Sequence, residues 1–393
     1  MLTSLSLIFL LGLLLGSIFN KLKLPSLLGM IFTGIILGPH VLNLLDDSII
    51  SISADLRQLA LVIILTRAGL SLDITDLKKV GRPAILMCFV PACFEIVGVI
   101  LIAPKLLGVT LLEAAIMGSV IAAVSPAVIV PRMIKIMEEG YGKEKSIPQL
   151  ILAGASVDDI FVIVIFTALT GLASGESVSG FRLLEIPISI LLGIIIGIIC
   201  GALLIRFFKK IHMRDSIKII ILLSISFLLI EFEHRLDGII PISGLLAIMS
   251  MGIFMKQSYS ILASRLSIKY NKLWVAAELL LFVLVGATVD ISYALLMGVS
   301  AIIIVILALI IRMIGVFICM LKTNLNMKER FFCMIAYMPK ATVQAAIGGI
   351  PLAMGLACGE KVLTVAVLAI LITAPLGAFF VDGMYKRLLV KNE

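Results

Sequence analysis

The stretch GASVDDI, residues 154–160, places two adjacent carboxylates in the middle of an apolar run that extends over residues 148–170. At about 1.5 Å per residue, a helix formed by this run is long enough to cross the hydrocarbon core of a bilayer. Asp158 and Asp159 then lie near the membrane midplane, where each carboxylate costs about 2.5–3.5 kcal/mol on insertion scales. Two interpretations account for that cost: a structural ion pair inside a helix bundle, or a site for a cation and a proton.

The composition places the whole chain in a membrane. Of its 393 residues, 61% are hydrophobic and only 14% are charged, which is far from the composition of a soluble domain. The net charge of +8 is dispersed over short connections, which argues against a nucleic-acid partner. The sequence contains no phosphate loop, nucleophile elbow or histidine pair with metal-site spacing, so we expect neither an enzyme nor a resident cofactor.

Apolar runs divide the chain into thirteen candidate spans. They are residues 2–19, 26–44, 57–71, 83–103, 111–131, 148–170, 185–205, 217–233, 239–255, 272–289, 293–318, 328–352 and 362–384. Connections on one side hold 24 of the 32 lysines and arginines, against five on or beside the other side. The positive-inside rule then predicts an external N-terminus and a cytoplasmic C-terminus. The membrane is expected to be the inner (plasma) membrane of a prokaryote.

Two of these spans contain proline where a continuous helix does not tolerate it. The fifth carries SPAVIVP at residues 125–131, and the twelfth carries MPKATVQ at residues 338–344. Proline removes a backbone donor and clashes with the preceding turn, so both helices are predicted to be interrupted near mid-membrane. One break alone is often a packing kink, whereas interrupted segments at matching places in two halves indicate a transporter site.

A repeated spacing links the two breaks. Glu95 precedes Ser125 by 30 residues, and Arg312 precedes Thr342 by 30 residues. If the halves are inverted repeats, Glu95 and Arg312 occupy equivalent places and can form a buried ion pair. An unpaired charge at that depth is expensive, which favours the pairing.

Four further charged residues are candidates for a role in transport. Arg67, with Asp73, is either a topological anchor or a gate, since arginine can extend to the interface from that position. Glu278 is either a carboxylate on the cation access route or an interfacial charge. Lys340 lies inside the second break, where it can neutralise the partial charges of the facing helix ends.

These residues resemble a known family, the monovalent cation:proton antiporters and specifically the NHA-type sodium/proton exchangers. The resemblance covers nearly the whole chain. It rests on residues 56–73, 91–95, 123–128, 155–159, 278–290 and 338–346. It implies an all-α polytopic membrane protein of about thirteen transmembrane helices, with inverted repeats and two crossed broken helices, which is the sodium/proton antiporter fold.

The resemblance also implies two subdomains with different roles within a single transporter domain, residues 1–393. A mobile core of roughly residues 83–170 and 293–393 slides, in an elevator-like movement, against a dimerisation panel of roughly residues 1–55 and 185–289. The protein is accordingly expected to be a homodimer surrounded by membrane lipid. Asp159 becomes the main Na⁺ ligand, with Asp158 as its partner.

One position departs from the wider superfamily. Its electrogenic bacterial members carry a lysine that pairs with the first aspartate, whereas the corresponding span here offers Arg312. The NHA-type pattern pairs such an arginine with the glutamate at the position of Glu95. Because arginine does not deprotonate at accessible pH, this favours electroneutral exchange of one proton per cation, without excluding the electrogenic alternative.

Together these features predict a secondary antiporter that exchanges Na⁺ or Li⁺ for H⁺ and serves pH homeostasis. Burial and like charge favour protonation of the aspartate pair, so a proton and a cation can compete for it. Ser125, Ser156 and Thr342 are candidate minor oxygen ligands. The alternatives are K⁺/H⁺ antiport, a sodium-coupled symporter of an organic anion, and, remotely, an intramembrane aspartyl protease, whose acids belong on two separate helices.

Overall fold

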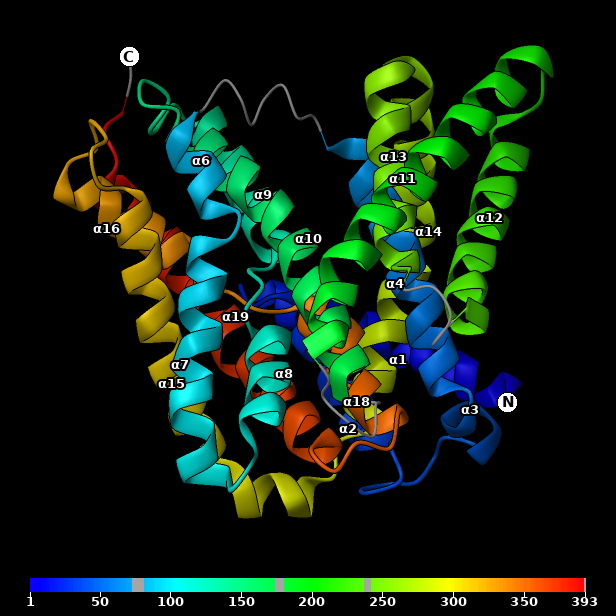
Figure 1. Cartoon of the computed structure of the whole chain (residues 1–393). Coiled ribbons are helices and arrows are strands. Elements are labelled where there is room, and N and C mark those ends of the chain that lie inside the picture. Colours follow the sequence, from blue (N-terminus) through cyan, green and yellow to red (C-terminus); the bar gives the residue numbers. More distant parts are fainter. Residues whose placement is uncertain (73–80, 174–179, 237–241, 392–393) are drawn as a thin grey trace. The chain divides into compact units, whose positions relative to one another are not determined.

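The computed structural model describes residues 1–72, 81–173, 180–236 and 242–391, and within these ranges the regular structure is helical. The helices are α1 (Leu2–Lys21), α2 (Ser26–Leu37), α3 (Asp47–Ser51), α4 (Ser53–Ser71), α6 (Arg82–Met87), α7 (Val90–Leu107), α8 (Leu111–Ile121), α9 (Pro126–Glu138), α10 (Ile147–Ala173), α11 (Gly180–Lys210), α12 (Asp215–Leu236), α13 (Gly244–Ser258), α14 (Ser260–Ala287), α15 (Ile291–Cys319), α16 (Met327–Ala336), α17 (Thr342–Ile347), α18 (Ile350–Ala353) and α19 (Gly359–Leu388). Figure 1 traces them along the chain.

The chain divides into two compact units. The first comprises residues 1–54, 75–173 and 281–393, and the second comprises residues 55–74 and 174–280. In the first unit α7 packs against α8 and α15, α10 against α8 and α9, and α19 against α16. In the second unit α13 packs against α11 and α12. Five charged candidates belong to the first unit: Glu95, Asp158, Asp159, Arg312 and Lys340.

Each of the thirteen predicted ranges contains at least one helix. Among the described residues, eight helices are long and apolar enough to span a membrane, and two shorter apolar segments accompany them at Ser26–Leu37 and Thr342–Ala353. Helices α4, α12 and α13, which overlap three other predicted spans, fall outside both groups. The all-helical membrane fold is therefore as predicted, while the number of crossings stays a prediction.

Three of the differences between predicted and observed helix boundaries have clear physical reasons. Helix α14 begins at Ser260 instead of residue 272. Its first turns carry exposed polar residues, so a search for apolar runs does not detect them. One of these residues, Arg265, forms an ion pair with Asp215 at 2.6 Å. The predicted span 83–103 is two helices, since Pro91 opens α7 in its first turn and cannot continue the hydrogen bonding of α6. Helix α2 stops at Leu37, before Gly38 and Pro39.

Both predicted breaks are present. Residues 122–125 are non-helical between α8 and α9, and Pro126 stands at the first position of α9, where its missing N–H is not needed. Residues 337–341, which include Pro339, separate α16 from α17. The lost intrahelical hydrogen bonds leave backbone groups that must find other partners, and these define the site.

Candidate functional site

The two breaks are bonded to each other. The N–H of Ser125 in the first break donates to the carbonyl oxygen of Pro339 in the second, at 2.8 Å. The side chain of Gln344, in the first turn of α17, donates from Nε2 to the carbonyl oxygen of Ala123 at 2.8 Å. Backbone groups that each helix gave up at its break are thus satisfied by the other broken helix, which fixes the two breaks side by side.

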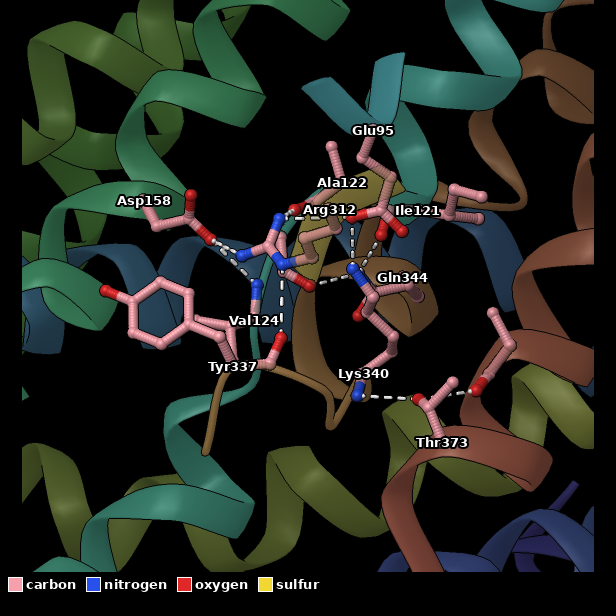
Figure 2. Close-up of polar contacts among 12 residues, drawn as sticks. Glu95, Ile121, Ala122, Val124, Asp158, Arg312, Tyr337, Lys340, Gln344 and Thr373 are labelled. Carbon is pink, nitrogen blue, oxygen red and sulfur yellow. Dashed lines mark hydrogen bonds and ion pairs between the residues drawn. The ribbon is translucent and has the colours of Figure 1, made fainter. Parts of the chain in front are cut away.

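Arg312 of α15 lies at the centre of the site and is completely buried (Figure 2). Its Nη2 donates to Asp158 Oδ2 at 2.7 Å, and its Nη1 donates to Glu95 Oε2 at 3.1 Å. The same guanidinium reaches both breaks, through the carbonyl oxygen of Ala122 and, at 3.1 Å from Nε, that of Tyr337. A planar five-donor group suits this arrangement, because it can satisfy several acceptors at fixed angles.

Lys340 contributes a second buried cation. Its Nζ contacts Glu95 Oε2, the same oxygen that accepts from Arg312. Its backbone N–H donates to Thr373 Oγ1 of α19 at 2.9 Å, which anchors the second break. The sequence suggested that Lys340 compensates the charges of the facing helix ends, and that role stays a prediction. The structure adds a specific carboxylate partner, Glu95.

Asp158 is held through one of its two carboxylate oxygens. Besides the Arg312 contact, Oδ2 accepts from the N–H of Val124 in the first break at 2.8 Å. The other oxygen, Oδ1, is buried and has no hydrogen-bond partner among the described residues. Asp159 is only partly buried, but its Oδ1 is inaccessible and likewise without a partner in the described part of the chain.

Two hydroxyl groups at the breaks are also buried without a hydrogen-bond partner among the described residues. Ser125 Oγ in the first break and Thr342 Oγ1 at the start of α17 are buried and have no partner within the ranges that the structure describes. Buried polar atoms are nearly always hydrogen-bonded, so such a group of unpartnered oxygens calls for an explanation. Ser156 was the remaining predicted ligand, and its side chain lies outside what the structure describes.

The other candidates lie in the second unit. Arg67 of α4 and Glu278 of α14 are partly buried, and their charges interact. The sequence prediction had paired Arg67 with Asp73, which lies outside the described residues. The second unit therefore brings together the two groups predicted as gate and access carboxylate.

The sequence analysis did not predict three contacts of the site. They are the ion pairs Arg312–Asp158 and Lys340–Glu95 and the hydrogen bond from Arg312 to the carbonyl oxygen of Tyr337. A charge count could have indicated the first two, because a second buried cation near mid-membrane needs a carboxylate of its own. The predicted contact of Glu95 with Arg312 is present, but as one part of a network of four charged side chains. Spacing along the chain gave no signal for Tyr337.

The helical fold, the two joined breaks and the buried charge network define a polytopic membrane transporter. The sequence profile of the family described as "Sodium/hydrogen exchanger, transmembrane" matches residues 6–384. The chain belongs to this family, and it is an integral membrane antiporter, not an enzyme.

Relatives and solved structures agree with this assignment. The chain is 33% identical over 387 residues to the human sodium/hydrogen exchanger 9B2, covering 94% of this chain and 71% of the relative. It is 31% identical over 399 residues to the human sodium/hydrogen exchanger 9B1, covering 94% and 73%. The fold is similar to that of the sodium proton antiporter MjNhaP1 from Methanocaldococcus jannaschii at pH 8, with a TM-score of 0.85, 19% identity and coverage of 98% and 97%.

Proposed function

We propose that this protein exchanges Na⁺, or Li⁺, for H⁺ at a site formed by Asp158 and Asp159. The observation that carries the proposal is that the two aspartates and one residue at each break each contribute a buried oxygen without a partner among the described residues: Asp158 Oδ1, Asp159 Oδ1, Ser125 Oγ and Thr342 Oγ1. A small alkali cation takes hard oxygen ligands, and carboxylate and hydroxyl oxygens are of that type. Asp159, which is the less buried carboxylate, is the main ligand, with Asp158 as its partner.

The charge balance of the site supports transport of one cation. Glu95 and Asp158 are matched by Lys340 and Arg312, so these four side chains sum to zero when all are ionised. Asp159 is then the one surplus charge among the described residues of the site. Either one proton or one Na⁺ neutralises it, which makes the two ions competitors and makes one-for-one, electroneutral exchange the expected stoichiometry.

The same balance argues against an organic anion as the substrate. A symporter of that kind needs a cation that can face a substrate carboxylate. Arg312 and Lys340 are fully buried and already bonded to carboxylates of the protein. K⁺ differs from Na⁺ only in size, so K⁺/H⁺ antiport remains the alternative that experiment must separate.

The wider mechanism rests on the family. We propose alternating access by an elevator-like movement of a core of roughly residues 83–170 and 293–393 against a panel of roughly residues 1–55 and 185–289, in a homodimer embedded in lipid. Protonation or cation binding lowers the cost of carrying the site through an apolar barrier, so the core crosses when it is occupied. An external N-terminus and a cytoplasmic C-terminus remain predictions from the distribution of lysine and arginine. The prokaryotic inner membrane remains a separate prediction.

Reconstitution tests the proposal. Purified protein is placed in liposomes that contain a pH-sensitive dye and are loaded at acid pH, and NaCl, LiCl, KCl or choline chloride is added outside. We expect alkalinisation of the lumen with Na⁺ and Li⁺ but not with choline. Alkalinisation with K⁺ alone would show that K⁺, and not Na⁺, is the exchanged cation. No response to any alkali cation would overturn antiport at this site.

A further inference from the structure

The hydroxyl of Tyr337, in the second break, is a buried polar group that the transport mechanism has not used. The side chain is 1% exposed, and its hydroxyl has no hydrogen-bond partner among the described residues. A buried hydroxyl without a partner is costly, and phenylalanine would fill the same space without that cost. The oxygen is therefore expected to bind something in at least one state of the protein.

The position of this hydroxyl depends on a glycine. A Cβ atom added at Gly154 of α10 would lie 2.1 Å from the Tyr337 hydroxyl oxygen and 2.8 Å from the Cβ of Met87. Any other residue at position 154 must displace the hydroxyl. The absence of a side chain at Gly154 thus leaves the space that the Tyr337 hydroxyl occupies.

Asp158 lies one helical turn after Gly154 on α10. Helical side chains lean toward the N-terminus of their helix, so the Asp158 carboxylate extends over the turn that contains Gly154. Figure 2 shows the Tyr337 ring on the same side of Arg312 as Asp158. The backbone carbonyl oxygen of Tyr337 accepts a hydrogen bond from Arg312 Nε at 3.1 Å, and the centroid of the Tyr337 ring lies 5.4 Å from the guanidinium carbon of Arg312.

The two oxygens of Asp158 are therefore unequal. Oδ2 is fixed by Arg312 and by the N–H of Val124, and Oδ1 is left with no described partner. We propose that Tyr337 is a positioning residue for the cation site: its hydroxyl donates to Asp158 Oδ1 through one bridging water, and this contact holds Oδ1 toward Na⁺. This inference rests on the proposed function, since it assigns Oδ1 to cation binding.

The test compares Tyr337→Phe with wild type in proteoliposomes, with initial rates measured over a range of Na⁺ concentrations. The substitution removes one oxygen and keeps the ring against Arg312. We expect the KM for Na⁺ to rise about two- to tenfold, the effect of losing one hydrogen bond, while the maximal rate stays within about twofold. Tyr270→Phe, at a fully buried tyrosine of the second unit, is the matched control and should leave both parameters unchanged.

A second pair of variants separates positioning from general packing. Gly154→Ala should raise the KM for Na⁺ more in the wild-type background than in the Tyr337→Phe background, because only the former has a hydroxyl to displace; the clash with Met87 is common to both. An unchanged KM in Tyr337→Phe, or equal effects of Gly154→Ala in both backgrounds, would overturn the inference. Failure of the proposed function itself would show differently, as a wild-type protein without Na⁺-dependent rates.

Discussion

The guanidinium of Arg312 lies 2.7 Å from the carboxylate of Asp158, although the two residues are 154 positions apart in the chain. The first of the two adjacent aspartates is therefore already matched by a fixed positive charge. Arginine keeps that charge at any accessible pH. Under the proposed function, Asp158 is then held as a ligand, and Asp159 is the group expected to change its charge.

Asp159→Asn is expected to abolish Na⁺-driven proton movement without unfolding the protein. A buried amide costs less than a carboxylate but can neither carry a proton nor neutralise a cation. Transport in proteoliposomes and melting temperature in detergent are measured together. Glu231→Gln, at an exposed position in the second unit, is the control that should keep full transport. Transport retained in Asp159→Asn would remove Asp159 from the site.

Glu95 and Lys340 are predicted to depend on each other for stability. Glu95→Gln leaves Lys340 without its carboxylate, and Lys340→Met leaves Glu95 with Arg312 alone, so each single change should cost about 3–5 kcal/mol. The double variant should lose less than the two single losses combined. A double-mutant cycle on melting temperature measures this, and strictly additive losses would contradict the contact seen between Lys340 Nζ and Glu95 Oε2.

Exchange is expected to be electroneutral, because one surplus carboxylate accepts either one proton or one Na⁺. In proteoliposomes with a fixed Na⁺ gradient, the luminal pH at steady state should not change when a K⁺/valinomycin potential is imposed. A luminal pH that follows the imposed voltage would show that net charge moves in each cycle and would overturn one-for-one exchange. That outcome would change the stoichiometry but not the family assignment.

Glu139, which directly follows α9 and lies outside the candidate membrane spans, makes a pH-dependent contact. The Tyr385 hydroxyl donates to Glu139 Oε2 at 2.6 Å, and this bond, helped by nearby lysines, holds the pKa of Glu139 below its usual value. Because the pKa of Glu139 is lower in the folded than in the unfolded protein, its ionisation stabilises the fold at pH values above about 4.3, the usual glutamate pKa. This stabilisation is lost as the pH falls through the lowered pKa.

Tyr385→Phe should therefore lower the melting temperature at about pH 7 and have a smaller effect at about pH 3, where Glu139 is more protonated. Tyr259→Phe, at a tyrosine that is not bonded to Glu139, serves as the control. A deficit of the same size at both pH values would mean that Tyr385 acts through packing alone.

Several features of this protein could be predicted because they depend on local composition. Apolar runs located helices in all thirteen predicted ranges, and prolines 126 and 339 located the two breaks. Asp158 and Asp159 stood out because charge in an apolar run is rare and costly. The 30-residue spacing even pointed to the contact between Glu95 and Arg312.

The partners of the remaining charges were decided by tertiary structure alone. Lys340 and Glu95 are 245 positions apart, and Arg312 meets Asp158 only because α10, α15 and the two breaks converge in one unit. Hydropathy and helix periodicity report the surroundings of a residue along its own helix, and they carry no information on which helix lies opposite. The sequence alone determined that buried charges must be paired. Packing decided that Arg312 binds two carboxylates, that Lys340 shares Glu95, and that Asp159 has no ion-pair partner among the residues the structure describes.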